Sequence, residues 1–424
     1  MLTLLIIADD FTGALDTGVQ FATRGVKTRV VTRADYDFSQ LDLEVQVLVI
    51  DAETRHLSSS EAYNIVYDIT KRAIKHKVPY LYKKTDSALR GNIGSELTAM
   101  LEAAEGKTLS FLLAFPKMKR LTKEGIHYIN GVPVKESVFG RDPFEPVTCS
   151  YIPQIIGNQS KVKVSVKAYS NLNDMSCDER KQLEPEIIVW DSESDKELQN
   201  LGRYLYETNQ MQLTAGCAGF ATALPELLGL KGERTQDIKS IDKFLVICGS
   251  VNPITLAQLD YAENHGFLRI RLSPEERLEK GFWTSSQGLE KLNIWKGLLK
   301  EQPYIILDSN DIPGTEATKE YAKEHGLSLA DVRVRIAESY GYILRFLMEH
   351  GLESTLMITG GDTLLGCMEQ LGVSEMEPLY ELAPGIVLSR FSVGGQKNQV
   401  ISKSGGFGQE SLLVDLVNNG FVKS

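Results

Sequence analysis

Residues 403–408 read Lys-Ser-Gly-Gly-Phe-Gly and follow an apolar run that is typical of a buried strand. Upstream, residues 359–363 read Thr-Gly-Gly-Asp-Thr and follow a second run of this kind. Small residues between a strand and a helix let backbone N–H groups approach a ligand at the positive end of the helix dipole. Two such turns in the C-terminal half predict an α/β unit that binds an anion such as a nucleotide phosphate.

Four side chains near these turns are candidates for contact with a nucleotide. Ser250 follows the strand that opens the C-terminal half and can donate to a phosphate or ribose, although a simple turn explains it equally well. Asp362 can hold Mg²⁺ through water, and Thr363 is expected to cap the following helix. Lys403 can neutralise charge on a transferred phosphoryl group. The spacing of these glycines differs from a Walker A loop.

Apolar runs alternate with segments of helical spacing along the N-terminal half. Strands are expected at residues 2–8, 45–50, 80–84, 110–115 and 187–190, and helices at 12–24, 58–76, 92–105 and 196–207. Ser58 followed by Glu61 forms a capping-box pattern at the start of the second helix. Residues 116–173 are irregular, which indicates a functional loop or an inserted subdomain. Strands that alternate with helices in this way predict a parallel sheet.

The polar stretch at 230–242 has no apolar face, so we place a linker there, between domains at 1–229 and 243–424. Beyond it, strands are expected at 244–247, 268–272, 304–307, 356–358 and 386–388, and a final helix at 410–419. The predicted fold class is therefore α/β, with two domains that each contain a mostly parallel sheet flanked by helices.

Composition limits the classes of function. The 46 basic and 56 acidic residues give a net charge of −10, which argues against nucleic-acid binding. The sequence has no run near the roughly 20 apolar residues of a membrane helix, and its apolar start lacks the features of a signal peptide. The five cysteines are scattered and lack metal-ligand spacing. We expect a reduced, cytoplasmic protein without a nucleic-acid or membrane partner, and the sequence leaves homo-oligomerisation open.

Two clusters of polar residues follow strands of the N-terminal half. Asp9 and Asp10 come directly after the first strand, where ligands bind in open α/β sheets. Adjacent carboxylates there can orient hydroxyl groups, ligate a metal or act as a base, whereas a helix N-cap explains a single aspartate equally well. Residues 83–92 (KKTDSALRGN) form the second cluster. Its lysines, aspartate and arginine suit a sugar acid, and the alternative is a solvated loop with a local ion pair. In the irregular region, Arg120 taken singly suits a structural role better.

Together these motifs resemble the four-carbon acid sugar kinases, bacterial enzymes that phosphorylate threonate, erythronate or 3-oxo-tetronate with ATP. The resemblance covers essentially the whole chain. It rests on residues 8–14 (ADDFTGA), 84–87 (KTDS), 90–94 (RGNIG), 114–116 (AFP), 249–250 (GS), 359–363 and 403–408. The chain departs from the family pattern at Ala88, where Thr is common, and at Lys119, where Gly is common. Both positions are expected near the acid pocket and bear on the choice of substrate.

The resemblance implies a sugar-acid domain, a nucleotide domain and an active site in the interdomain cleft. It implies ATP contacts at Ser250, Gly360, Gly361, Asp362, Thr363 and Gly405. The substrate-binding candidates are Asp9, Lys84, Arg90, Asn92 and Arg120. We predict transfer of the γ-phosphoryl group of ATP to the terminal hydroxyl of the acid, with Mg²⁺ at Asp362. Either Asp10 or Asp86 would accept the hydroxyl proton, and Lys403 would complete the catalytic set.

Two alternatives remain open from the sequence. One is a kinase for another small hydroxy acid, such as glycerate or a five-carbon acid. The other is a non-catalytic sensor that binds nucleotide and sugar acid, although a sensor needs neither a base nor a phosphoryl-neutralising lysine.

Overall fold

The computed structural model describes residues 1–142, 145–170, 184–233 and 241–419. The chain divides into two compact units, Met1–Arg234 and Thr235–Ser424, and each is described by itself. The boundary falls inside the predicted linker, of which residues 234–240 lie outside the described residues. Each unit combines helices with a mostly parallel sheet, so the predicted fold class is confirmed.

Unit 1 is built on a parallel sheet. Its strands, in spatial order, are β2 (Thr28–Val31), β3 (Val47–Asp51), β1 (Leu4–Ala8), β4 (Tyr80–Lys84), β11 (Leu213–Gly216), β5 (Thr108–Leu112), β10 (Glu186–Asp191) and β9 (Lys163–Ala168). Every adjacent pair is parallel. The central strand β1 is buried along its whole length, as expected for a sheet with both faces covered.

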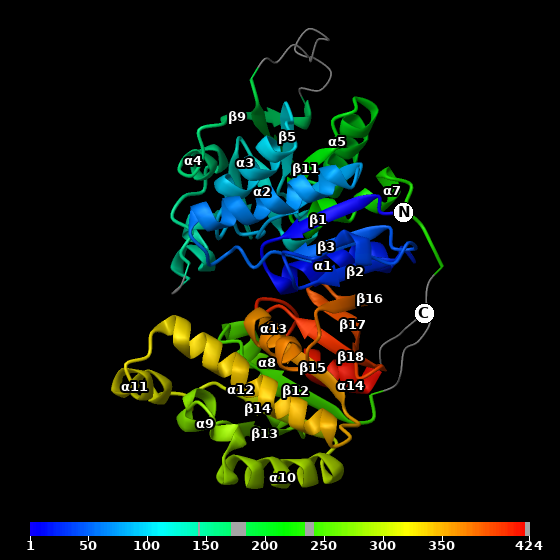
Figure 1. Ribbon diagram of the computed structural model, residues 1–424. Coiled ribbons are helices and arrows are strands. Elements are labelled where there is room, and N and C mark those ends of the chain that lie inside the picture. The colour runs from blue at the N-terminus through cyan, green and yellow to red at the C-terminus, as the bar shows by residue number, and fades with distance from the viewer. Residues whose placement is uncertain (143–144, 171–183, 234–240, 420–424) are drawn as a thin grey trace. The chain divides into compact units, whose positions relative to one another are not determined.

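The helices of unit 1 cover the sheet. They are α1 (Phe11–Ala22), α2 (Ser59–Lys75), α3 (Ile93–Ala103), α4 (Ile152–Gly157), α5 (Asp195–Glu207), α6 (Ala218–Ala221) and α7 (Leu224–Leu227). Helices α2 and α3 pack side by side (Figure 1). The capping box of α2 is confirmed, because Ser58 and Glu61 each bond the backbone N–H of the other. The irregular region contains a small antiparallel sheet of β6 (Arg120–Lys123), β7 (Ile126–Ile129) and β8 (Val132–Pro133).

Unit 2 has a mixed sheet. Its strands, in spatial order, are β13 (Leu268–Arg271), β14 (Tyr304–Asp308), β12 (Phe244–Cys248), β15 (Thr355–Thr359), β18 (Gln396–Lys403), β17 (Ile386–Val393) and β16 (Glu375–Ala383). The pairings from β13 to β18 are parallel, whereas β17 pairs antiparallel with both of its neighbours. The parallel strands of this sheet resemble the sheet of unit 1. The antiparallel strands β17 and β16 extend it at one edge.

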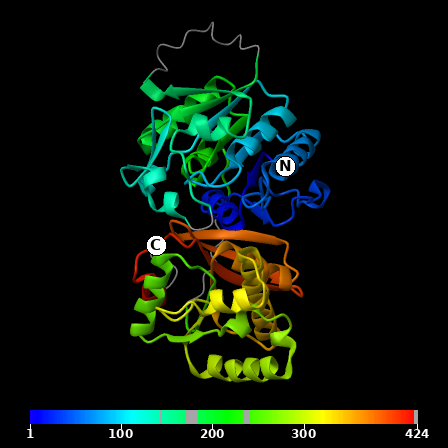
Figure 2. The same ribbon diagram turned by 90° about the vertical axis from the view of Figure 1, so that its left-hand side faces the viewer.

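The helices of unit 2 include α8 (Pro253–Asn264), α9 (Pro274–Leu278), α10 (Ser286–Glu301), α11 (Ala317–Glu324), α12 (Leu329–Glu349), α13 (Gly361–Gln370) and α14 (Leu412–Asn419). Helices α12 and α13 lie side by side, as Figure 1 shows. Figures 1 and 2 agree that α10 lies at the end of this unit opposite β16. Within the described residues no helix is both long and apolar enough to span a bilayer. Across both units, the four cysteines for which a state is described, Cys149, Cys217, Cys248 and Cys367, are free thiols.

Candidate active site

Three neighbouring strands of unit 1 bring the predicted acidic and basic residues together. Strand β1 lies between β3 and β4, and its last residue, Ala8, pairs with Asp51 on one side and with Lys84 on the other. Asp9 and Asp10 follow β1 directly, so they lie beside the segments that leave β3 and β4. The order of the strands, rather than proximity in sequence, assembles this cluster at the carboxyl edge of the sheet.

Arg55, which follows β3, lies at the centre of this cluster. Its Nε donates to Asp9 Oδ2 at 2.9 Å, and its Nη1 donates to Asp10 Oδ2 at 2.8 Å. Its Nη2 lies 2.9 Å from Asp9 Oδ2, 2.8 Å from Asp10 Oδ1 and 3.8 Å from Asp86 Oδ1. One buried guanidinium group therefore contacts three carboxylates. No motif in the sequence indicates Arg55.

Asp86 and Arg90 form a two-pronged ion pair in the segment after β4. Arg90 donates to the two Asp86 oxygens from Nε and Nη2, each at 2.9 Å. The same carboxylate accepts the backbone N–H groups of Ala88 and Arg90. Burial acts to raise the pKa of Asp86, but the charges of Arg90 and Arg55 outweigh it and hold the pKa well below its usual value. Asp86 is therefore anionic at neutral pH.

Asp10 is the N-cap of α1. Its Oδ1 accepts the N–H of Gly13 at 3.0 Å, and its Oδ2 accepts the hydroxyl of Thr12 at 2.9 Å. Burial acts to raise the pKa of Asp10, but Arg55 and Lys84 more than offset this effect, so the pKa lies below its usual value. With two further bonds from Arg55, both Asp10 oxygens are fully engaged. The carboxylate is held in place but is poorly placed to take a proton.

The two other predicted cations lie in the same region. Lys84 is buried with its Nζ 3.9 Å from Asp9 Oδ1, and a Cβ on Gly13 would lie only 2.6 Å from this ammonium. Arg120 donates to the hydroxyl of Ser87. The guanidinium groups of Arg90 and Arg120 lie 5.4 and 5.3 Å from the ring centre of Phe139, within the range of cation–π contact.

The side-chain amide of Asn92 holds the backbone of a neighbouring loop, and the residue also lines a hollow of unit 1 that Arg90 borders. Its side-chain amide donates to the carbonyl groups of Thr54 and Leu57, each at 2.9 Å, and its Oδ1 accepts from Ser59. Both amide hydrogens are therefore engaged within the protein. Asn92 secures the loop that carries Arg55.

At Lys119, where the family commonly has glycine, the backbone conformation is one that favours glycine. Lys119 adopts a φ of 53° in the left-handed region, a conformation that glycine adopts without strain.

A buried ion pair lies behind this cluster. Lys83 Nζ is 3.0 Å from Glu96 Oε2, and the two side chains are 0% and 1% exposed. Burial raises the pKa of Glu96, although Lys83 acts in the opposite direction. We expect Lys83→Met to lower the free energy of unfolding by about 3–5 kcal/mol, because it strands a buried carboxyl group. Urea unfolding measures this change.

The exposed pair Lys319–Glu316 supplies the matched control for that variant. Its Nζ–Oε2 distance is 2.9 Å, and its side chains are 77% and 67% exposed. Lys319→Met should change the free energy of unfolding by less than about 1 kcal/mol. If Lys83→Met and Lys319→Met changed the free energy of unfolding equally, removal of Lys83 would not leave a costly buried carboxyl group at Glu96.

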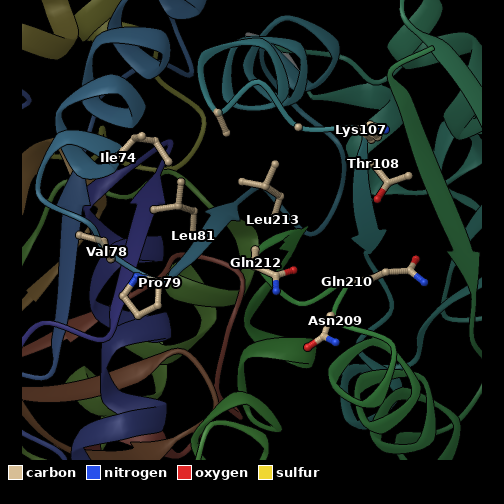
Figure 3. Close-up of a pocket in the computed structure, with 12 residues that line it drawn as sticks. Ile74, Val78, Pro79, Leu81, Lys107, Thr108, Asn209, Gln210, Gln212 and Leu213 are labelled. Atoms are coloured by element: carbon tan, nitrogen blue, oxygen red, sulfur yellow. The ribbon is translucent and has the colours of Figure 1, made fainter. Parts of the chain in front are cut away.

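Two hollows lie at opposite edges of unit 1. One, of about 340 Å³, is lined by Arg90, Thr148 and Gln159 among others, and so adjoins the charged cluster. The other, of about 320 Å³, lies at the amino ends of β4, β5 and β11 (Figure 3). It has apolar residues such as Leu81 on one side and amides such as Gln210 on the other. Only the first hollow is next to the predicted substrate residues.

In unit 2, the ends of β12, β15 and β18 bring the predicted phosphate turns together. A Cβ on Gly249 would lie 1.8 Å from Thr363 Oγ1, and a Cβ on Gly405 would lie 2.6 Å from Ser250 Oγ. The contact at Gly249 leaves little space for a side chain, whereas a side chain at Gly405 would require the Ser250 hydroxyl to turn away. Gly360 has a φ of 106°, which an L-residue with a side chain rarely adopts. Ser250, residues 360–363 and Gly405 thus lie next to one another.

The N-terminus of α13 differs from the prediction in one respect. Its N-cap is Gly360, which provides no side-chain hydrogen bond, and Thr363 lies inside the first helical turn. The expectation that Thr363 caps this helix is therefore wrong, because the helix begins at Gly361 rather than at Leu364. A helix start without a side-chain cap leaves N–H groups that lack an intrahelical partner, which suits the binding of an anion.

Lys403 and Asp362 have distinct environments. The ammonium of Lys403 donates to Thr255 Oγ1 at 2.9 Å and to the carbonyl groups of Ser404 and Gly405, each at 3.2 Å. Burial lowers its pKa to about 8. Lys403 thus ties the glycine-rich turn to α8. Asp362 has a 43% exposed side chain, 3.7 Å from Arg333. In the described ranges, no group of three or more His, Cys, Asp or Glu side chains is arranged to hold a metal ion.

Together, the two units define a class of protein with a sugar-binding N-terminal domain and a nucleotide-binding C-terminal domain. Residues 4–224 match the family model described as a sugar-binding N-terminal domain. Residues 245–413 match the model described as a nucleotide-binding C-terminal domain. The chain belongs to the four-carbon acid sugar kinase family, which confirms the resemblance seen in its motifs.

Named relatives match nearly the whole chain. It is 30% identical to the D-threonate kinase of Salmonella typhimurium, over 97% of each chain. It is 26% identical to the D-erythronate kinase of Heliobacterium modesticaldum, over 96% of this chain and 94% of the relative. It is 23% identical to the 3-oxo-tetronate kinase of Methylobacterium radiotolerans, over 96% of each chain.

Two crystal structures share the fold. A protein of Salmonella typhimurium LT2 superposes with a TM-score of 0.77 at 20% identity, over 98% of each chain. A protein of Haemophilus influenzae superposes with a TM-score of 0.72 at 19% identity, over 99% of this chain and 100% of the other.

Proposed function

We propose that this protein is an ATP-dependent kinase that phosphorylates the terminal hydroxyl of a four-carbon acid sugar: threonate, erythronate or 3-oxo-tetronate. The observation that carries the proposal is that kinases of all three names match this chain nearly from end to end. Two features support it: the buried cluster of charges at the carboxyl edge of unit 1, and the glycine-lined turns of unit 2.

In this proposal unit 1 binds the sugar acid. Lys84 and Arg120 supply positive charge for the substrate carboxylate, and Arg90 contributes from the wall of the adjoining hollow. Asp86 orients the attacking hydroxyl. We prefer it to Asp10 because each Asp10 oxygen already has two close donors, whereas the described bond at Asp86 Oδ1 is the single one from Arg90 Nη2. A depressed pKa makes Asp86 a weak base. This is acceptable because phosphoryl transfer depends mainly on positioning and electrostatic stabilisation.

Unit 2 binds ATP in this proposal. The N–H groups at the start of α13 and the turn at Gly405 would contact the phosphates, with Ser250 beside them. We assign Lys403 to shaping this turn, because its ammonium is bonded to the carbonyl groups of the turn. Mg²⁺ in kinases is held by one or two carboxylates and the substrate phosphates, and Asp362 offers one carboxylate. When bound, the ion would neutralise phosphate charge.

A coupled assay of ADP release tests this function. Threonate, erythronate and 3-oxo-tetronate are offered singly with ATP and Mg²⁺, with glycerate, a five-carbon acid and no acid as comparisons. At least one tetronate should stimulate turnover well above glycerate. Binding of ATP and acid without turnover would favour a sensor, and stimulation by glycerate alone would place the substrate in another class.

A further inference from the structure

We propose that Arg55 is a positioning residue for phosphoryl transfer: its guanidinium group fixes the carboxylates of Asp9, Asp10 and Asp86 as one unit. The inference rests on the proposed function, and it adds a residue that no motif of the chain indicates. Arg55 acts through the carboxylates that it holds.

The geometry indicates Arg55 rather than another cation. Among the described ion pairs, Arg55 is the cation that contacts all three carboxylates, at 2.8 to 3.8 Å. Lys84 approaches only Asp9 within ion-pair distance, at 3.9 Å. A planar guanidinium group can serve several oxygens at once, whereas an ammonium group is a point charge. The side chain is 9% exposed, so water competes little for these bonds.

The segment around Arg55 is fastened to the segment that carries Asp86 and Arg90. Asn92 bonds the carbonyl groups on either side of Arg55, at Thr54 and Leu57. A Cβ on Gly91 would lie 3.2 Å from Arg55 Cγ, so the two backbones pack closely. Arg55 is therefore placed by the β4–α3 connection, while it places the carboxylates that follow β1.

Without a cation among them, neighbouring carboxylates repel one another and tend to separate or take up protons. Other charged groups also face this region and would remain in an Arg55 variant. They are Asp16, Asp51, Glu53, Lys84, Arg90, Arg120 and Asp142. Removal of one positive charge should raise the pKa values of Asp10 and Asp86, because Arg55 lowers both.

The test compares wild type, Arg55→Lys and Arg55→Met. We expect Arg55→Lys to lower kcat by about 10- to 100-fold with the KM for ATP within about 2-fold of wild type, since mispositioning of this size is costly. In Arg55→Met the acid limb of the pH profile of kcat/KM should move to higher pH. Comparison of crystal structures of wild type and Arg55→Lys should show that the Asp9 and Asp10 carboxylates are displaced in the variant. This readout does not depend on activity.

Arg269 supplies the matched control. It is a buried arginine of unit 2 that contacts Asp260, Glu263 and Asp308. Arg269→Lys should lower the melting temperature comparably and leave kcat and the pH profile near wild type. The inference would be overturned if Arg55→Lys kept the wild-type kcat, or if Arg55→Lys and Arg269→Lys lost kcat equally. It would also be overturned if the Asp9 and Asp10 carboxylates did not move in the crystal structure of Arg55→Lys. A wild-type protein that turns over none of the acids would instead contradict the proposed function, and the crystal structures would still decide the role of Arg55.

Discussion

Replacement of Asp86 by alanine is expected to lower kcat/KM for the sugar acid by about 10³-fold, within the range that a positioned proton acceptor contributes. The carboxylate accepts two backbone N–H groups and both prongs of Arg90. Its removal deletes the group proposed to orient the hydroxyl and leaves Arg90 without its principal counter-charge. The coupled assay of ADP release measures the loss, and calorimetry should show unchanged affinity for ATP.

Glu186→Gln is the control for that substitution. Glu186 is buried in unit 1 and forms an ion pair with Lys163 at 3.2 Å, where β10 begins. It lies at the amino end of a strand, away from the charged cluster at the carboxyl edge. Its replacement should leave kcat/KM near wild type. If Asp86→Ala kept more than about a tenth of wild-type kcat/KM, Asp86 would not be the acceptor that this reaction class uses.

Replacement of Gly249 by alanine should weaken ATP binding by about 100-fold, equivalent to about 3 kcal/mol. The new Cβ would lie 1.8 Å from Thr363 Oγ1 and 3.0 Å from Thr363 Cβ. Threonine is stiff at χ1, so α13 or the turn after β12 must shift. Such a shift disorganises the N–H groups proposed to hold the phosphates. Calorimetric titration with ATP measures the effect, and affinity for the sugar acid should not change.

Gly297 allows a matched comparison for Gly249→Ala. It lies in α10, and a Cβ there would meet no heavy atom within 4 Å. Gly297→Ala should leave the Kd for ATP unchanged and stabilise the helix slightly, because alanine favours the helical state. Wild-type affinity in Gly249→Ala would mean that the turns of unit 2 do not hold the nucleotide.

Much of the fold was visible in the sequence because long buried strands and amphipathic helices have distinct periods. The bounds predicted for β4 agree with the structure, and the capping residue of α2 was identified. Strand β2 was missed because its apolar residues are only Val30 and Val31, too short a run to indicate a strand. Strand β16 was missed because it contains Pro378, which weakens a strand pattern. The apolar end of β18 was recognised before Lys403, but its polar first half was not.

The candidate site was predictable where its residues are contiguous. Lys84, Asp86 and Arg90 occur within one short run, and their residue types suggested the roles that we propose for them. Arg55 depends on β3 lying beside β1, a long-range fact that local pattern does not carry. Its position just after a strand was the available signal. The hydrogen bonds of the Lys403 ammonium could not be predicted, because they depend on the direction of its side chain. The periodicity of the sequence indicates only that the strand before Lys403 is buried.

The strand order of unit 1 has a consequence for how the chain folds. Strand β4 pairs with β11, so Leu81 must find Leu213, roughly 130 residues later, before the sheet is complete. During synthesis the edge of β4 therefore keeps unpaired backbone N–H and C=O groups until β11 has been made. Such an edge is a site for association with other nascent chains. Recovery from denaturant should accordingly be slow and sensitive to protein concentration.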